Sequence, residues 1–401
     1  MKNNFDAFKP HYSFMKMSGC YEIDKSNTKM KQTLHRYYRI LVLIVFCTFC
    51  FQHMVQVYKL RDDAEEMVNT LYVLLTLYNS LGKLLVYNIR RGRIEKIAEA
   101  IRGPVFAPNS KTHEELMERN AKNMWLLLRS NHALMIICSL LWMTYPLACR
   151  FLGQEVKFDM HFSFSTERLS VFLLVVLYIT IMVHWVSLST ATMDCTVYGF
   201  YMQARLQLQM LRHNLMHIAD LEDEDSNENN EKIEVKLYRD LENMRFNDLF
   251  HARLVRCVKR HQLIVWLVDV VESTFRSSMI LQFLVMAWVI CMTLYKIVSL
   301  DFLSAEFMTM IAYMNCVLVQ LFLICYFGTQ LKDESEFVNQ SIYESDWPAV
   351  SPRLRRSLLI MMERCYRPIE PCVAYIVPMS LDIFISVVKS SYSLYTFLDR
   401  K

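Results

Sequence analysis

The last apolar stretch of the chain, residues 372–398, carries a line of polar side chains. On a helix they fall on one face, because they recur at steps of four, four and three residues: Asp382, Ser386, Ser390 and Ser393. Lys389 lies at the edge of this line, and the five residues together are called the polar stripe. A charge at the centre of a bilayer costs about 2.5–3.5 kcal/mol on insertion scales, so such side chains normally face protein or water. The polar stripe therefore predicts either a polar seam between helices or the wall of an aqueous path.

An aqueous path needs several copies of this helix, because one stripe cannot enclose a pore. Symmetric subunits around a shared axis would supply the copies. Three apolar side chains near the end of the stretch could form a constriction at the outer mouth of the path: Leu394, Phe397 and Leu398. No paired carboxylates, metal-ligand cluster or nucleophile motif stands out. We therefore expect no enzyme, no cofactor, no metal site and no nucleic-acid partner.

The composition indicates an integral membrane protein. The chain has 401 residues and is 54% hydrophobic, above the roughly 45–50% of soluble domains. The excess is clustered in runs near the ~20 residues needed to cross a bilayer. The twelve cysteines are scattered without metal-ligand or redox spacing, so we interpret them as small apolar packing residues. The basic N-terminal segment has no apolar core of a signal peptide, so we expect no cleaved leader.

Seven stretches are long and apolar enough to be membrane-spanning helices, and helices are expected because unpaired backbone groups are costly in lipid. They are Ile40–Tyr58, Met67–Tyr87, Asn131–Cys149, Leu169–Ser189, Ser273–Val298, Ala305–Gly328 and Cys372–Leu398. The predicted fold is thus an all-α integral membrane protein with seven transmembrane helices. Transporters usually show repeats and interrupted midplane helices, and neither is visible here.

Lys and Arg in the links predict the orientation of these helices. The N-terminal segment and the second, fourth and sixth links are basic, whereas the first, third and fifth have few or no basic residues. By the positive-inside rule the N-terminus is cytoplasmic, and seven crossings then place the C-terminus outside. A G-protein-coupled receptor has the opposite orientation. Its DRY-like tripeptide and NPxxY-like run are also missing from the third and seventh spans.

The cytoplasmic links contain further predicted elements. Residues 221–234 are acidic and free of aromatics, which is typical of a disordered loop. After it, apolar residues at helical spacing predict that the fifth helix starts deep in the cytosol and continues into the membrane. Ser351 and Pro352 suit the start of a short amphipathic helix that ends before Pro368. Its apolar side is expected to pack on a partner helix or subunit, with lipid headgroups as the alternative.

The end of the chain resembles the insect odorant receptor family. The matching features are the region of Trp347, the basic helix after it, Arg367–Pro368, "VPMSLDIF" from Val377 and the closing "SSYSLYTFL". The related gustatory receptors usually end with a TY-plus-QF pattern, whereas here Ser391 precedes Tyr392 and no QF follows. The link between the fourth and fifth spans is shorter than that of the family's co-receptor, so the chain resembles a ligand-specific tuning subunit.

The resemblance implies an odorant-binding subunit of a ligand-gated, nonselective cation channel that depolarises olfactory neurons. It implies a heterotetramer with the odorant receptor co-receptor, a volatile small molecule as ligand, and conduction of monovalent and divalent cations. The expected location is the plasma membrane, in contact with lipid, on dendrites of olfactory sensory neurons. A metabotropic, G-protein-coupled chemoreceptor and a gustatory-type receptor channel remain the alternatives.

The resemblance also assigns residues to sites. The last helix would line the pore, with the polar stripe and Leu394, Phe397 and Leu398 as wall and gate. The cytosolic ends of the later helices would anchor one subunit to the next, through Trp266, Leu354, Leu358 and Met362. The odorant would bind in the outer half of the bundle, among helices two to six: Val68, Tyr72, Leu75, Cys138, Trp142, Tyr145, Tyr178, Ile179, Met182, Met308 and Tyr313. Aromatic and Met side chains suit a volatile ligand because they supply contact area with few directed hydrogen bonds.

These assignments divide the chain into four parts. Residues 1–39 are the cytoplasmic N-terminal segment, and residues 40–330 hold helices one to six, with a long cytoplasmic link at 190–262. Residues 331–371 form the anchor region. Residues 372–401 form the pore-lining helix and a short extracellular tail.

Overall fold

The first six predicted spans each fall on one long helix of the computed structural model, and most of the seventh falls on another. The helices are α2 (Lys29–Lys59), α3 (Ala64–Ile89), α5 (Lys111–Phe151), α6 (Leu169–Met216), α7 (Val235–Ser299), α8 (Ala305–Tyr343) and α10 (Leu381–Asp399). The structure describes residues 4–22, 28–153, 156, 158–218, 235–302, 304–345, 347, 350–374 and 377–399. Among these residues, five helices are long and apolar enough to cross a membrane by length and composition: α2, α5, α6, α7 from Phe246 onward, and α8. The predicted disordered loop at 221–234 lies outside the described residues.

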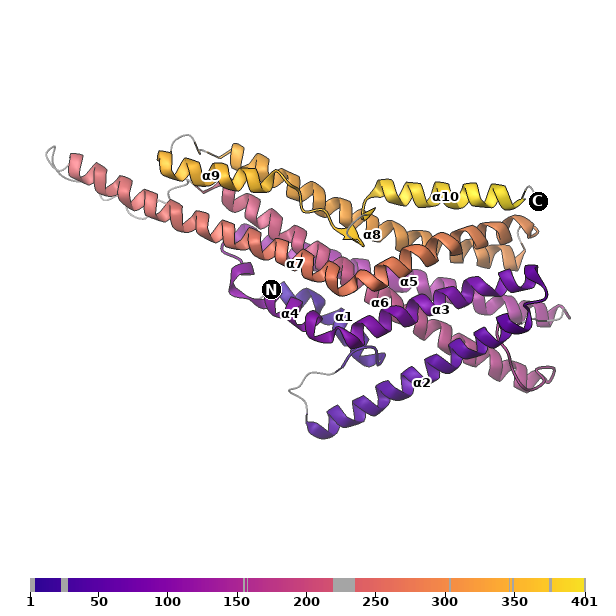
Figure 1. Ribbon diagram of the computed structural model, residues 1–401. Helices are drawn as coiled ribbons and strands as arrows, with labels where there is room; N and C mark the ends of the chain where they lie inside the picture. The colour runs from indigo at the N-terminus through magenta and orange to yellow at the C-terminus, as the bar shows by residue number, and fades with distance from the viewer. Residues whose placement is uncertain are drawn as a thin grey trace.

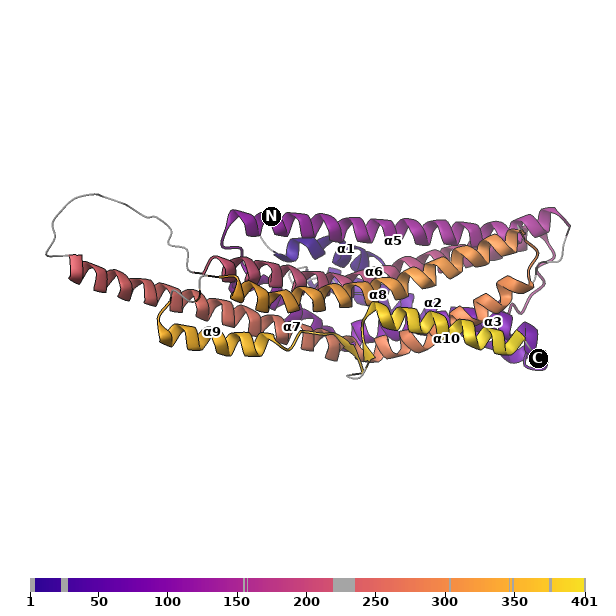
Figure 2. The same cartoon turned by 90° about the horizontal axis from the view of Figure 1, so that it is seen from above.

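The helices form one elongated bundle in which α6 is central (Figures 1 and 2). Every residue of α6 from Ser189 to Ala204 is buried, which is the pattern of a helix surrounded on all sides. Its main neighbours are α5 and α8. The N-terminal elements and the short helix α9 (Pro352–Cys365) lie towards one end of the bundle, and the C-terminus lies at the other end. An odd number of crossings requires such an arrangement.

The predicted link at 190–262 is helical over most of its described length, because α6 continues to Met216 and α7 begins at Val235. The prediction that the fifth helix starts well before its apolar part and continues into it without a break is confirmed, since α7 is one helix from Val235 to Ser299. The extensions of α6, α7 and α8 run beside one another, with α9 against α7 and α8 (Figure 2). Helix α9 begins as predicted, with Pro352 in its first turn, although Ser351 makes no side-chain capping bond.

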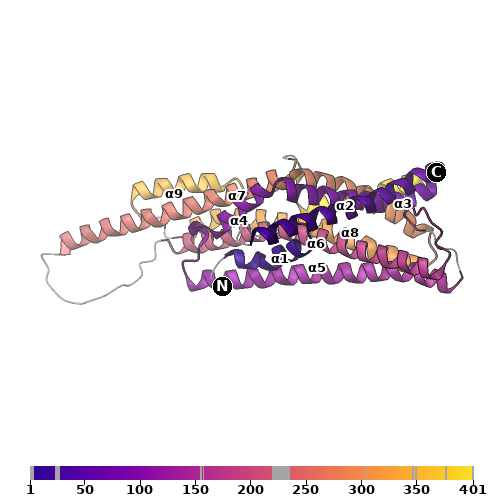
Figure 3. The same ribbon diagram turned by 90° about the horizontal axis from the view of Figure 1, so that it is seen from below.

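The N-terminal segment packs inside the bundle, although it was predicted only to be a cytoplasmic segment. The 3₁₀ helix η1 (Asn4–Phe8) and helix α1 (Lys9–Met17) lie beside α5 and α6, as Figure 3 shows from below. The ring of Phe8 lies 5.1 Å from that of Phe200 on α6. Asn4 donates to the carbonyl of Phe106 at 2.6 Å. Phe106 ends the short 3₁₀ helix η2 (Pro104–Phe106), which follows α4 (Arg91–Arg102).

The last predicted span is wrong at its start. Instead of continuing a helix, Cys372–Val373 (β1) and Val377–Pro378 (β2) pair as a short antiparallel hairpin, and α10 begins at Leu381. Proline explains the difference, since Pro378 lacks the N–H that a helix interior needs. Glu272 on α7 accepts a hydrogen bond from the backbone N–H of Cys372 at 3.1 Å and ties the hairpin to the bundle. The 19 residues of α10 still approach the length of a membrane span.

Gly328 on α8 is required by the close approach of the chain just before α10. A Cβ at this position would collide with the backbone carbonyl of Met379. We expect Gly328→Ala to destabilise the protein by about 1–3 kcal/mol, the usual cost of overpacking. Thermal unfolding of the detergent-solubilised protein would measure the change. Gly92→Ala is the matched control because nothing lies within 4 Å of its Cβ position, and an equal loss in both variants would contradict the steric explanation.

Candidate ligand cavity and candidate pore face

A cavity of about 460 Å³ opens among α2, α3, α5, α6 and α8. Ligand pockets in proteins typically measure about 300–1,000 Å³, so it can hold a small organic molecule. Its wall is largely apolar and aromatic, with hydroxyl groups from α3, α5, α6 and α8. The lining includes Tyr72, Thr76, Ser80, Cys138, Trp142, Tyr145, Asp159, Ile179, Thr190, Lys296, Glu306, Tyr313 and Gln320.

Three aromatic side chains form one side of the cavity. The ring centroid of Tyr313 lies 5.4 Å from that of Tyr72 and 5.6 Å from that of Trp142, and the last two are 6.3 Å apart. Both tyrosine hydroxyls form hydrogen bonds with other residues of the wall. Tyr313 shares a hydrogen bond of 2.6 Å with Thr76, and Tyr72 donates to the sulfur of Met310 at 3.7 Å. This aromatic triad (Tyr72, Trp142 and Tyr313) therefore offers mainly ring surface to a ligand, since the two hydroxyls already have partners.

Charged groups gather at the end of the cavity near the loops. Lys296 on α7 forms an ion pair with Glu306 on α8 at 3.0 Å, and Tyr145 donates to the other oxygen of Glu306 at 3.2 Å. The Lys296 ammonium lies 5.7 Å from the ring centroid of Tyr72. Asp159, in the link between α5 and α6, lines the same end. The charged groups at this end can bond a polar atom of a ligand.

Asp159 gives this end of the cavity a pH-dependent charge. Burial raises the pKa of its carboxyl to about 6, against the opposing effect of Lys296. Between the ordinary pKa near 4 and this value, the folded state holds a proton that the unfolded state has lost. Lowering the pH from 7 to 5 should therefore stabilise the fold and raise its melting temperature by about 1–2 °C.

Thermal unfolding of the solubilised protein at both pH values would measure this effect. Asp159→Asn should lose this part of the pH dependence, because its amide does not titrate. A variant with an unchanged pH response would contradict the assignment to Asp159.

Six of the eleven residues predicted for the ligand site line this cavity: Tyr72, Cys138, Trp142, Tyr145, Ile179 and Tyr313. Four others lie elsewhere, because their side chains point to other faces of the same helices. Tyr178 donates a hydrogen bond to Gln52 and packs against Phe49. Met182 belongs to the buried core, and Leu75 packs against that core. Met308 is 47% exposed. The side chain of Val68 lies outside the described residues.

The sequence analysis missed two groups of lining residues. Helix α2 was not included in the expected site, yet Phe49, His53 and Gln56 line the cavity. On α3, the predicted Tyr72 is followed at steps of four residues by Thr76 and Ser80, which were not predicted. Polar groups at this spacing in an apolar span were a usable signal, similar to the one that identified the polar stripe.

The polar stripe of α10 points away from its own subunit. All five of its residues, Asp382 to Ser393, are exposed. The opposite side of α10 packs on the bundle: Phe384 contacts Phe322 on α8 edge-on, and Ser391 donates to the carbonyl of Ala287 on α7 at 3.3 Å. The polar stripe therefore does not form a polar seam with another helix of this chain. It faces either a neighbouring chain or water. The side chains of Leu394, Phe397 and Leu398 lie outside the described residues.

The predicted anchor residues are only partly available to another subunit. Leu354 and Leu358 are buried, and Met362 is packed against the same core. The apolar side of α9 thus covers α7 and α8 of its own chain, which corrects the expectation that Leu354 and Leu358 meet a partner. Trp266 on α7 is 38% exposed and stays available.

Comparisons with known proteins match the chain to one family. The model of the family described as 7tm Odorant receptor matches residues 63–392. Odorant receptor 22b of Drosophila melanogaster is 26% identical over 39% of this chain and 39% of its own length. The odorant receptor coreceptor of Aedes aegypti is 29% identical over 33% of this chain and 27% of its own length. These two matches span less than two fifths of each relative, whereas Odorant receptor 46a, isoform B, of Drosophila melanogaster is 22% identical over 90% of this chain and 88% of that protein.

Solved structures of the same fold are also known. The structure of the insect olfactory receptor OR5 from Machilis hrabei superposes with a TM-score of 0.81 at 14% sequence identity, covering 98% of this chain and 97% of that one. Its complex with eugenol gives a TM-score of 0.82 at the same identity and covers 98% of each chain.

Proposed function

This chain belongs to the odorant receptor family, and on that premise we propose that it is the odorant-binding subunit of a ligand-gated, nonselective cation channel. A volatile that binds in the cavity would open the channel and depolarise an olfactory neuron. The observation that carries the proposal is the pairing of two features in one chain. An aromatic cavity lies within the subunit, and a polar helix face remains uncovered outside it.

The cavity would take a volatile with an apolar body and one polar atom. The aromatic triad would hold the body, since its hydroxyls already have partners in the wall. The charged end, at Lys296 and Glu306, would take the polar atom. The eugenol complex of the Machilis hrabei receptor supports a ligand of this kind, because eugenol combines a phenol ring with oxygen substituents.

The polar stripe would line the pore in an assembly with the family's co-receptor. Four α10 helices around an axis would turn their exposed faces inwards, and Asp382 with the three serines would replace part of the water around a monovalent or divalent cation. Leu394, Phe397 and Leu398 are the proposed constriction. The extensions of α6, α7 and α8 with residues 331–371 form the proposed anchor region, with Trp266 as its candidate contact between subunits.

The proposed orientation places the N-terminus and α9 in the cytosol and the C-terminus outside the cell. The distribution of Lys and Arg supports it. In this orientation the charged end of the cavity, at Asp159, Lys296 and Glu306, lies near the extracellular links, on the side from which a volatile arrives. The proposed location is the plasma membrane of olfactory dendrites.

Whole-cell recording from cells that express this chain with the co-receptor tests the proposal. A panel of volatile phenols, esters, alcohols and aldehydes, including eugenol, should contain compounds that evoke a cation current. The current should persist when G-protein signalling is blocked. Loss of the entire current under that block would favour a metabotropic receptor and overturn the channel proposal.

A further inference from the structure

A pair of charged residues is buried beneath the floor of the cavity. Lys83 on α3 lies 2.7 and 2.8 Å from the two carboxylate oxygens of Asp194 on α6, and their side chains are only 4% and 8% exposed. Burial of such a pair adds little net stability, because the cost of removing both charges from water offsets their attraction. Lys83 lies within the predicted span 67–87, and ionisable residues inside membrane spans often mark functional sites. Stability alone therefore does not account for Lys83 and Asp194.

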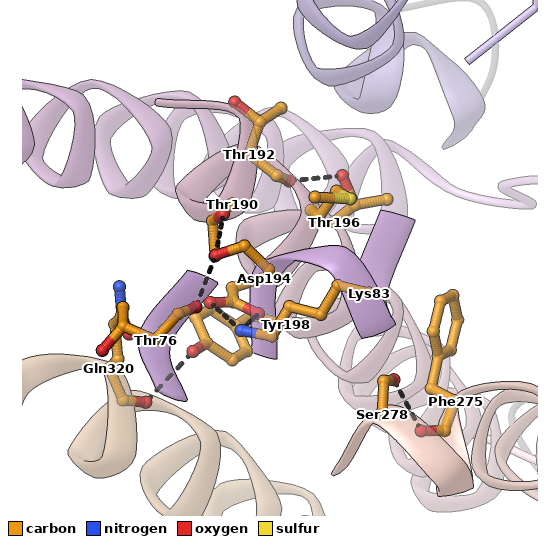
Figure 4. A network of polar contacts seen from close by, with 12 residues as sticks. Thr76, Lys83, Thr190, Thr192, Asp194, Thr196, Tyr198, Phe275, Ser278 and Gln320 are labelled. Atoms are coloured by element: carbon orange, nitrogen blue, oxygen red, sulfur yellow. Dashed lines mark hydrogen bonds and ion pairs between the residues drawn. The ribbon is translucent and has the colours of Figure 1, made fainter. Parts of the chain in front are cut away.

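The pair is joined to the cavity through its floor. Ser80 and Thr190 both line the cavity, and their hydroxyls share a hydrogen bond of 3.0 Å between α3 and α6. Lys83 follows Ser80 by three residues and Asp194 follows Thr190 by four, so the ion pair lies one helical turn below this bond (Figure 4). A ligand that changes the spacing of α3 and α6 at the floor therefore changes the geometry of the ion pair.

On its other side the pair faces helix α7 across a small gap. Lys83 and Asp194 line a cavity of about 10 Å³ together with Ser278 and Gln282 of α7. Gln282 is 3% exposed, and its side-chain nitrogen has no hydrogen-bond partner among the described residues. An unpaired buried donor costs about 1–3 kcal/mol. The carboxylate of Asp194 lines the same gap, so a small movement of α7 towards α6 would let Gln282 donate to it.

Movement of α7 at this level would be transmitted to α10. Five residues after Gln282, the carbonyl of Ala287 accepts the hydrogen bond from Ser391 on α10. Ten residues before Gln282, Glu272 holds the hairpin that precedes α10. Helix α7 therefore contacts α10 and its connection on both sides of Gln282.

We propose that Lys83, Asp194 and Gln282 form a two-state polar switch between the cavity and the pore helix. In the ligand-free arrangement Asp194 pairs with Lys83. In the conducting arrangement the ion pair loosens, and Gln282 donates to Asp194 as α7 and α10 shift. The inference rests on the proposed channel function. The three residues of the switch do not line the odorant cavity and do not belong to the polar stripe.

Basal and odorant-evoked currents, both divided by the amount of protein at the cell surface, test the switch. Lys83→Met with Asp194→Asn removes both charges but keeps an acceptor for Gln282, so basal current should rise about fivefold or more. Gln282→Leu removes the donor with little change in size and should lower the maximal evoked current by about the same factor. Adding Gln282→Leu to the double variant should return basal current towards the wild-type level.

Thr192→Val is the matched control, since Thr192 is buried two residues before Asp194 but bonds His132 on α5. It should leave both currents unchanged. The odorant panel that includes eugenol serves as the probe. Wild-type evoked current in Gln282→Leu at normal surface amount would overturn the switch, and this uncharged variant decides the question even if the double variant fails to fold. If the wild type itself carries neither current, the channel proposal fails and the switch fails with it.

Discussion

Trp142→Ala should raise the odorant concentration needed for half-maximal current about tenfold or more. Trp142 supplies one face of the aromatic triad, and its ring lies 5.6 Å from that of Tyr313 across the cavity wall. Loss of a large aromatic contact from a small-molecule site removes about 1.5–3 kcal/mol of apolar contact, which corresponds to a factor of about ten to a hundred. Concentration–response curves in cells with the co-receptor would measure the shift.

Two controls separate a binding defect from a folding defect. An opener that acts on the co-receptor should give the wild-type maximal current in Trp142→Ala. Tyr178→Phe is the second control, because Tyr178 bonds Gln52 outside the cavity. Removing this hydroxyl should leave odorant sensitivity within about twofold of wild type, because neither Tyr178 nor Gln52 lines the cavity. Equal losses of both responses in Trp142→Ala would point to misfolding.

The sequence predicted the helices well because membrane insertion depends on local properties. Hydropathy over about 20 residues identified each long helix, and the apolar period before residue 273 identified the long start of α7. The polar stripe could also be read, since its spacing depends only on helical geometry. The hairpin before α10 could not, because two-residue strands are too short to form a pattern. Pro378 was nevertheless a visible reason to begin the helix later.

The candidate site was only half predictable, because a helix shows its faces but not which neighbour each face meets. Tyr178 and Ile179 are adjacent, yet only Ile179 lines the cavity. Lys83 and Asp194 are separated by 111 residues, and Asp194 lies in the predicted cytoplasmic link 190–262, so nothing in the sequence paired the two charges. The buried N-terminal segment did carry a signal, since Phe5, Phe8 and Tyr12 follow one another at helical spacing.

Ser390→Leu should reduce single-channel conductance about threefold or more, while the amount of protein at the cell surface stays unchanged. Ser390 is exposed on the polar stripe, so a leucine there would not collide with the subunit's own bundle. In the assembled channel the same side chain would narrow the path and remove a hydroxyl from its wall. Single-channel recording in the presence of the co-receptor would measure the change.

Ser390→Ala separates bulk from polarity at the same position. An alanine leaves the path open, so its conductance should remain close to that of the wild type if space limits the current, whereas an equal loss in both variants would assign the effect to the hydroxyl. Thiol-reactive reagents added from outside to Ser390→Cys and Ser393→Cys provide an independent test, because a water-lined face must react. If neither cysteine reacts during odorant stimulation and Ser390→Leu conducts normally, the polar stripe meets a neighbouring chain. The ion path would then lie elsewhere in the assembly.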